Sequence, residues 1–411
     1  MRDNALAKGL HKAGHEVSML PMYLPLQLDE KPLNEEEAPP IFFGGINVFL
    51  QQKVSFFRKT PRWFDRLLNG AGLLRAAAKR SHMTSAREHG EMALAMLRLE
   101  ESNLTKELDK LVDWLAEDRP DVVSLSTTLQ GGMIRTLKER LGAKVVVSFQ
   151  GEDSFLDGLP EPFRTECWQE MGARLKDADL IFSPSQFYAD LMRERLAMPE
   201  LKIEVLPNGI DLAGYEQEVP KEEPPAIGYL ARMMKEKGLE TMVEAYIHLR
   251  KELGVGNVQL KLAGTAVTGD WELIGRQRAL LHQAGLTEEV TWATNISREE
   301  KVQFLKSLTL FSVPANYPEA FGLYTIEALA AGVPLVQPRA ASFTEIIGKS
   351  EGGVLVEPED PIALAEAWRD LLADEERRKT LAESGRHSAR EHYSMDAMRD
   401  RFLGLVEELR L

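Results

Sequence analysis

Two glutamates, Glu319 and Glu327, are the residues whose positions point most directly to chemistry. Glu319 follows an apolar run, residues 310–314, that predicts a buried parallel strand. Glu327 lies inside residues 323–331, which have the composition of a helix. Gly322 lies just before this helix, where the first backbone amides lack partners and attract anions such as phosphate. Because a carboxylate repels a phosphate, we expect the two glutamates to accept hydrogen bonds from hydroxyl groups.

A ligand with hydroxyl groups beside a phosphate is typically a sugar nucleotide. These residues alone also allow an ordinary helix N-terminus with two solvated glutamates. The order Glu319, seven residues, Glu327 and then Ala-Leu-Ala-Ala-Gly-Val-Pro resembles the signature of family 4 retaining glycosyltransferases. The resemblance implies an α/β fold with two Rossmann-like domains facing a cleft, the GT-B arrangement. It also implies that Glu319 lies at the transferred sugar and Glu327 at the nucleotide ribose.

Two cations lie at the start of the second half of the chain. Residues 226–230 predict a strand, and the loop after it carries Arg232 and Lys237 before a predicted helix over 239–253. The resemblance implies that both cations bind the donor diphosphate, where each charge-assisted hydrogen bond contributes about 1.5–3 kcal/mol. They would leave no need for a metal or another cofactor. The alternative is that they are ordinary surface charges.

Further donor contacts are expected where other strands end. Residues 258–264 predict a strand ending in Gly264, which would let a ligand approach. The segment ending in Asn295 and Ile296 resembles the one whose backbone contacts the nucleotide base in the family. The expected catalytic residues are therefore Glu319, Arg232 and Lys237, and the expected donor-binding residues are Glu327, Gly322, Leu323, Tyr324, Asn295, Ile296 and Gly264.

The first half alternates predicted strands and helices, which indicates a parallel sheet covered on both faces. Gln150, Glu152 and Asp153 follow the predicted strand 144–149, and ligands of such sheets bind beyond the carboxyl ends of strands. We therefore expect these three residues on the acceptor side. The family usually has a His near this point, and Gln150 cannot move a proton near neutral pH as His can.

Asp177 and Asp179 have the Asp-x-Asp spacing that binds metal in the other large glycosyltransferase architecture. They lie where a predicted helix gives way to the strand 180–183, a junction at which the family commonly has Ala-Asp. We therefore interpret the pair as structural and expect no metal site.

Turn chemistry predicts the domain boundaries. Pro207, Asn208 and Gly209 form a strong turn, which the family uses as the junction between its halves. The expected domains are an acceptor-side domain over 1–208 with a helical insert at about 41–100, a nucleotide-sugar-binding domain over 209–392, and a terminal helix over 393–411 that crosses back to the first domain.

The start of the chain departs from the family pattern. Residues 4–13 predict a helix and residues 16–20 a short strand, but a doubly wound domain should open with a strand and a glycine-rich turn before that helix. We expect either a truncated chain with a misassigned start or a genuine variant that lacks this strand.

Bulk properties narrow the class of protein. The chain has 411 residues, enough for two domains, and a net charge of −14, which argues against nucleic acid as a partner. Cys167 is the only cysteine, and the sequence contains neither an apolar run long enough to span a membrane nor a secretory signal at its start. These properties predict a cytoplasmic protein.

Two other classes of function remain open. Gln150 and the missing first strand would fit a nucleotide-sugar-binding protein with weak or no transferase activity. A sugar-nucleotide epimerase or a phosphorylase would keep the same fold. A dinucleotide dehydrogenase is disfavoured, because no Gly-x-Gly-x-x-Gly follows a predicted strand.

One basic stretch generates a prediction of its own. Residues 51–87 carry nine Lys or Arg and one Asp in an otherwise acidic chain, and aromatic residues are interleaved over 49–64. An inserted helical hairpin with solvated charges would explain this, as would peripheral contact with anionic membrane through 49–87. In flotation assays, membrane contact predicts binding to vesicles containing phosphatidylserine that about 0.5 M salt abolishes, because salt screens charge. Equal recovery with pure phosphatidylcholine vesicles would contradict it.

Overall fold

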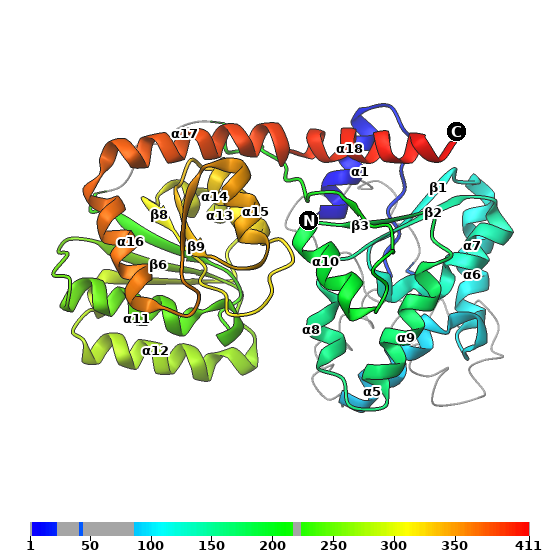
Figure 1. Cartoon of the computed structure of the whole chain (residues 1–411), viewed down its shortest axis with the longest axis horizontal. Helices are drawn as coiled ribbons and strands as arrows, with labels where there is room; N and C mark the ends of the chain where they lie inside the picture. The colour runs from blue at the N-terminus through cyan, green and yellow to red at the C-terminus, as the bar shows by residue number, and fades with distance from the viewer. Residues whose placement is uncertain (1, 23–40, 44–85, 217–222, 411) are drawn as a thin grey trace. The chain divides into compact units, whose positions relative to one another are not determined.

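The computed structural model describes residues 2–22, 41–43, 86–216 and 223–410 (Figure 1). The chain divides into two compact units. The first comprises residues 3–206 and 401–411, and the second residues 207–400. Each unit is described below by itself.

The first unit is built on a parallel sheet that, within the described residues, has the strand order β1-β2-β3-β4. Helices connect successive strands, as parallel pairing requires. Its strands and main helices are α1 (Arg2–Lys12), α5 (Ala86–Leu97), α6 (Thr105–Asp118), β1 (Val122–Leu125), α7 (Ile134–Leu141), β2 (Lys144–Ser148), α8 (Glu152–Asp157), α9 (Phe163–Leu175), β3 (Leu180–Ser183), α10 (Gln186–Arg195) and β4 (Glu204–Val205).

The second unit is built on a larger parallel sheet with the order β10-β9-β8-β5-β6-β7. Its strands and main helices are β5 (Ala226–Leu230), α11 (Leu239–Lys251), β6 (Gln259–Gly264), α12 (Trp271–Gln283), β7 (Val290–Thr294), α13 (Arg298–Lys306), β8 (Leu310–Phe311), α14 (Leu323–Ala330), β9 (Leu335–Pro338), α15 (Ala341–Ser350), β10 (Gly353–Val356), α16 (Pro361–Ala373) and α17 (Glu375–His392). Both units confirm the predicted α/β class.

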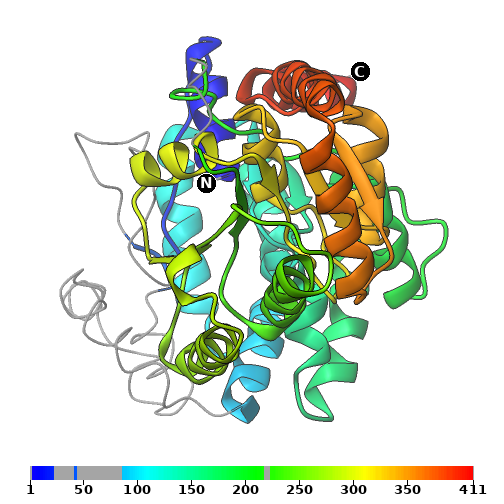
Figure 2. The same cartoon turned by 90° about the vertical axis from the view of Figure 1, so that its left-hand side faces the viewer.

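Helices cover both faces of the second sheet. The chain moves outward from β5 through β6 to β7 and then returns to β8, and right-handed crossovers therefore place α11 and α12 on one face and α13, α14 and α15 on the other. Helix α16 packs on α11, and α17 packs on α14 and α15. Figure 2, in which this unit faces the viewer, shows α11 and α12 in green, with the orange-red α16 beside α11.

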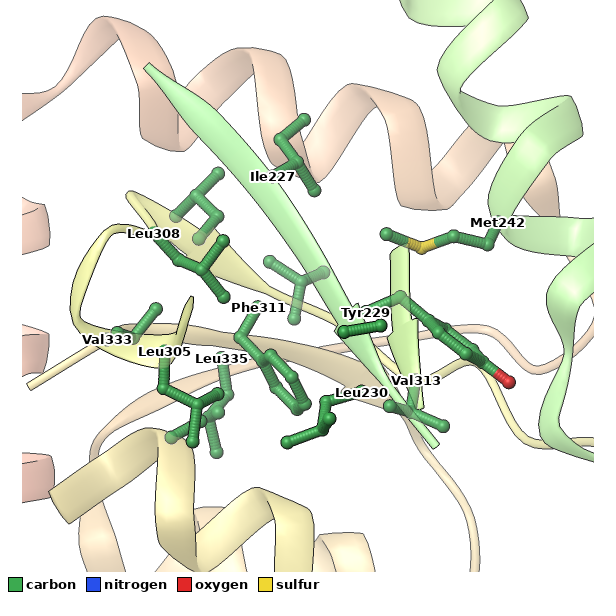
Figure 3. Close-up of a cluster of buried hydrophobic side chains, with 14 of the residues drawn as sticks. Ile227, Tyr229, Leu230, Met242, Leu305, Leu308, Phe311, Val313, Val333 and Leu335 are labelled. Carbon is green, nitrogen blue, oxygen red and sulfur yellow. The ribbon is translucent and has the colours of Figure 1, made fainter. Parts of the chain in front are cut away.

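The core of this unit explains why its central strands form where the sequence predicts them. Every residue of β5 is buried, because β5 lies between β8 and β6 and under helices on both faces. Apolar side chains from β5, β8, α11 and α13 meet in one cluster (Figure 3). A fully buried parallel strand reads as a continuous apolar run, as residues 226–230 do.

Helix α18 (Met395–Glu407) ends the chain together with a short 3₁₀ turn. Its residues up to Asp400 belong to the second unit and those from Arg401 onward to the first. Within the first unit, Phe402 packs on Phe182 of β3 with ring centroids 5.7 Å apart. None of the described helices is both long and apolar enough to cross a membrane.

In the first unit, one sequence prediction is wrong and another lies mostly outside the described residues. The strand predicted over residues 16–20 is wrong: this segment follows α1 without regular structure, and its neighbour Met22 makes only an isolated bridge to Phe42. A short apolar alternation becomes a strand only where a partner edge is available. Of the predicted helical insert, residues 44–85 lie outside the described residues, as does most of the basic stretch, and α5 begins at Ala86.

The only cysteine is deep in the first unit. Cys167 lies on α9 and is fully buried. Burial, which disfavours the thiolate, raises the pKa of Cys167 to about 11. Its thiol therefore stays protonated and shielded at neutral pH.

One glycine at the end of β6 generates a prediction about stability. Gly264 has φ +145°, and a Cβ there would lie 1.7 Å from the carbonyl oxygen of Ala231. We expect Gly264→Ala to destabilise the protein by more than about 2 kcal/mol, because the backbone of the loop after β5 must move. The thermal unfolding midpoint measured by circular dichroism would then fall by several degrees.

Gly275 on α12 provides the matched control. A Cβ at this exposed helical position meets nothing within 4 Å. Gly275→Ala should therefore stabilise the helix by up to about 1 kcal/mol. If both variants unfolded at the temperature of the parent protein, the close approach at Gly264 would not contribute to the free energy of unfolding.

Candidate active site

The predicted donor residues follow four strands that are neighbours in the second sheet. β8 precedes Glu319, β5 precedes Arg232 and Lys237, β6 ends in Gly264, and β7 precedes Asn295. Parallel strands have their carboxyl ends at one edge, and ligands of such sheets bind there. The order β8-β5-β6-β7 therefore brings these loops to the same edge of one sheet.

The loops after β5 and β8 lie directly against each other. The amide of Asn316 donates a hydrogen bond to the carbonyl oxygen of Glu236 over 3.0 Å. Gly238, with φ +72°, passes so close to the loop after β8 that a Cβ would lie 1.8 Å from the carbonyl oxygen of Pro314. Close packing at Gly238 thus carries Lys237 toward the loop that contains Glu319.

Glu319 is the centre of a compact polar cluster. Its Oε2 accepts a hydrogen bond from Lys237 Nζ at 2.5 Å, from the Tyr317 hydroxyl at 2.8 Å and from the Tyr324 hydroxyl at 2.7 Å. Lys237 also donates to the Tyr317 hydroxyl and lies 4.7 Å and 5.2 Å from the ring centroids of Tyr317 and Tyr324. Glu319 is only 8% exposed, so its charge is balanced almost entirely by protein groups.

The tyrosine on α14 is a permanent hydrogen-bond donor. Burial, followed by the nearby charge of Glu319, raises the pKa of Tyr324 well above its ordinary value. Its ring packs on Phe311 and Phe343, with centroid distances of 6.2 Å and 6.4 Å. Tyr324 therefore stays protonated, and its ring position is fixed by the core.

Glu327 has a different partner. It lies on α14, is 6% exposed, and its Oε1 is 2.7 Å from Lys301 Nζ of α13. The side chains of Glu327 and Lys301 are 8% and 10% exposed, so the pair is largely removed from water. The structure thus gives the two glutamates separate cations, Lys237 for Glu319 and Lys301 for Glu327.

Arg232 is held by an acidic residue that follows β6. Its Nε and Nη2 donate to the two carboxylate oxygens of Asp270, each over 3.1 Å, and the amide of Val267 donates to the same carboxylate over 2.9 Å. The hydrogen bond with Asp270 raises the pKa of Arg232. Burial opposes ionisation of Asp270, but the hydrogen bonds from Arg232 and Val267 outweigh it and lower the pKa of Asp270. Arg232 remains 45% exposed at its side chain and can reach a ligand.

The N-terminus of α14 offers backbone donors beside this cluster. Gly322 precedes the helix in the left-handed conformation, with φ +75°, and no side chain caps the first turn. Leu323 and Tyr324, the first helical residues, are only partly buried. Their amides are of the kind that binds anions.

Asn295 joins the ends of β6 and β7. Its amide donates to the carbonyl oxygen of Gly264 over 2.8 Å, and its side-chain oxygen accepts from the amide of Ala266 over 3.3 Å. Asn295 has φ +56°, a conformation that Asn tolerates better than most residues. Ile296 follows and packs against the core of the unit.

The acceptor-side candidates differ in solvent exposure and in hydrogen bonding. Gln150, two residues after the end of β2, is exposed. Glu152 is 5% exposed and accepts four hydrogen bonds, from the Thr127 hydroxyl, the amide of Thr128 and the amides of Gln150 and Gly151. Glu152 therefore ties the loop after β1 to the loop after β2.

Asp153 is also 5% exposed and accepts a hydrogen bond of 2.7 Å from the Tyr188 hydroxyl. Of the three candidates, only Gln150 presents its side chain to solvent. Asp177 and Asp179 lie in ion pairs with Arg135 at 2.9 Å and Lys138 at 3.1 Å, respectively. No group of three or more His, Cys, Asp or Glu arranged to hold a metal ion occurs in the described part of the chain.

Sequence reasoning missed the partners of the predicted residues. Tyr317 lies two residues before Glu319, and its hydroxyl could have been proposed from that spacing. Lys301 precedes Glu327 by 26 positions, and Asp270 follows Arg232 by 38, so only the folded sheet and α13 bring them together. No local pattern marks either pair.

Solved structures share this fold. The sucrose-phosphate synthase of Thermosynechococcus elongatus is 22% identical, with a TM-score of 0.62 over 74% of this chain and 79% of that protein. Anabaena HepE, solved in complex with UDP-glucose, is 16% identical, with a TM-score of 0.61 over 95% of this chain and all of HepE. Together with two parallel α/β units, these similarities define the GT-B class of glycosyltransferase folds.

Two family models match almost all of the chain beyond its first part. The model "Glycosyltransferase Family 4" matches residues 89–213, and "Glycosyl transferases group 1" matches residues 215–388. The chain belongs to the family 4 glycosyltransferases, as the resemblance at Glu319 and Glu327 implied.

Curated relatives carry several specificities. A D-inositol 3-phosphate glycosyltransferase of Xylanimonas cellulosilytica is 28% identical over 67% of this chain and 64% of its own length. A GDP-mannose-dependent phosphatidylinositol monomannoside mannosyltransferase of Mycolicibacterium smegmatis is 24% identical over 85% of this chain and 91% of its own length. The chain spans less than two thirds of the first relatives that it matches.

The Lys301–Glu327 pair generates a prediction. Lys301→Met removes the close cation from a carboxylate that stays buried, and we expect the free energy of unfolding to fall by about 3–5 kcal/mol. The thermal unfolding midpoint should fall, and the double variant Lys301→Met/Glu327→Leu should recover part of the loss because no buried charge remains.

Lys379 on α17 is the control, since its ion pair with Glu375 at 3.0 Å is exposed. Lys379→Met should leave the unfolding midpoint unchanged, because exposed pairs contribute little. If Lys301→Met matched Lys379→Met, the buried pair would not support the position of Glu327.

Proposed function

We propose that this protein is a retaining glycosyltransferase that moves a sugar from a nucleotide-diphosphate sugar to an acceptor without a metal ion. The observation that carries the proposal is the arrangement at one edge of the second sheet. Lys237 and Glu319 are in contact there, and Arg232 and the N-terminus of α14 lie at the same edge. A diphosphate and a sugar would find cations, backbone amides and a hydroxyl acceptor together.

The side-chain cations would supply most of the phosphate binding. Charge-assisted hydrogen bonds from Arg232 and Lys237 contribute about 1.5–3 kcal/mol each. The helix N-terminus at Gly322 and Leu323 adds about 0.3–2 kcal/mol. All of them would stabilise the charge that develops on the leaving diphosphate. Because this charge can be met by protein groups, the proposal needs no metal.

The two glutamates would orient the donor. Glu319 would accept a hydrogen bond from a hydroxyl of the transferred sugar, and Glu327 from the nucleotide ribose. The segment at Asn295 and Ile296 would contact the base through its backbone, with Gly264 allowing close approach. Relatives whose names state a nucleotide use GDP-mannose or were solved with UDP, so a nucleoside diphosphate sugar is the donor class we propose.

The transfer itself would occur on one face of the sugar. The bond between the anomeric carbon and the diphosphate oxygen breaks, the acceptor oxygen bonds to that carbon on the same face, and the acceptor proton passes to the leaving phosphate. Gln150, the exposed acceptor-side candidate, would contact the acceptor. The acceptor is a glycan, a lipid or a small molecule, and the membrane contact through residues 49–87 stays a prediction.

The test compares site variants with surface variants. Lys237→Ala and Glu319→Ala should each lower the rate of sugar transfer, or of donor hydrolysis where no acceptor is found, by at least about 100-fold. The donors to screen are UDP-, GDP- and ADP-sugars, first by thermal shift and then by nucleotide release in the presence of EDTA. Proton NMR of the product should show the anomeric configuration of the donor.

Lys379→Ala and Glu376→Ala are matched controls, because they remove the same charges from the exposed surface of α17. They should keep full activity. Unchanged turnover in Lys237→Ala and Glu319→Ala would refute the site, and loss of turnover in EDTA would refute metal independence. Isomerisation of the donor without an acceptor would indicate an epimerase.

A further inference from the structure

The contacts of Glu319 divide unequally between its two oxygens. Lys237, Tyr317 and Tyr324 all donate to Oε2. Within the described part of the chain, Oε1 accepts no hydrogen bond from the protein. The carboxylate is thus oriented through one oxygen, which leaves the other able to accept a further hydrogen bond.

The three donors to Oε2 differ in how they are held. Tyr324 is fixed in the first turn of α14 by its contacts with Phe311 and Phe343. The hydroxyl of Tyr317 bonds to both Glu319 and Lys237. Lys237 belongs to a short 3₁₀ turn, Lys235–Lys237, and its ammonium is at the end of a flexible stem. Of the three, Lys237 is the donor that can move without disturbing the core.

A phosphate ligand would compete with Glu319 for the ammonium group of Lys237. Lys237 is 17% exposed and Glu319 10% at their side chains, so their attraction is only weakly screened. If Lys237 turned to a phosphate, Glu319 would lose its cation while it stayed buried. A buried carboxylate without hydrogen bonds costs several kcal/mol, but two hydroxyl donors offset much of this cost.

From this geometry, and resting on the function proposed above, we propose that Tyr317 and Tyr324 are positioning residues that hold Glu319 by Oε2 while Lys237 exchanges this carboxylate for a phosphate of the nucleoside diphosphate. Glu319 thereby competes with the ligand for Lys237. The tyrosine hydroxyls lower the free-energy cost of separating Lys237 from Glu319, so that the phosphate can replace the carboxylate. The same two hydroxyls hold the carboxylate, with Oε1 presented, when Lys237 has left it.

The first arm of the test measures nucleoside diphosphate binding by calorimetry. The probe is whichever of UDP, GDP and ADP the parent protein binds most tightly. Glu319→Gln should bind it about tenfold more tightly, since one charge-assisted bond no longer has to be broken. Lys237→Ala should bind it more weakly, and adding Glu319→Gln to Lys237→Ala should give no tightening.

The second arm tests the tyrosines. The variant Tyr317→Phe/Tyr324→Phe should bind the same nucleotide about tenfold more weakly, because Glu319 would then depend on Lys237 alone. In the Glu319→Gln background the same two substitutions should no longer weaken binding, because the carboxylate that the hydroxyls position is gone. A loss that persisted there would mean that the hydroxyls contact the ligand directly, and it would overturn the positioning role.

The remaining outcomes separate this inference from the proposed function. Tightening by Glu319→Gln that persisted in the Lys237→Ala background would indicate simple repulsion between Glu319 and the ligand, and would overturn the exchange. If the parent protein bound none of the three nucleotides, the proposed function would fail and the exchange with it. If the double tyrosine variant failed to fold by circular dichroism, the single variants Tyr317→Phe and Tyr324→Phe would decide, each with about half of the effect.

Discussion

Charge compensation within the protein governs the carboxyl edge of the second sheet. Lys237 neutralises Glu319, Lys301 neutralises Glu327 and Asp270 neutralises Arg232, so each of the charged residues expected to handle the donor has an internal counterpart. The two Lys–Glu pairs let ionised groups remain largely buried, since a lone buried charge would be costly. A ligand that binds here exchanges one set of partners for another.

This compensation depends on how closely the loops approach. Gly238 and Gly264 allow backbone contacts that a side chain would prevent, and these contacts bring together the loops after β8, β5 and β6. The strand order sets which loops are neighbours, and the glycines set how near they come. Without both, Lys237 could not reach the loop that carries Glu319, and Arg232 could not reach Asp270.

The sequence predicted individual strands well where they are buried under helices on both faces. Residues 180–183 and 226–230 form strands with the expected bounds, since their apolar runs end at turns. The strand prediction for residues 16–20 was wrong, because an apolar alternation alone does not supply a partner strand. The sequence also marked Glu319 and Glu327, but not Lys301 or Asp270, whose contacts span long stretches of chain. The roles of the marked residues stay predictions until they are tested.

The shielded thiol of Cys167 has a practical consequence for following the two units. Since the chain's only native cysteine is fully buried with a raised pKa, maleimide reagents should react slowly with the folded protein at neutral pH. One exposed cysteine introduced into each unit would then carry a fluorophore or a spin label against a low background. Distances between the labels could be recorded during turnover with the native Cys167 left in place.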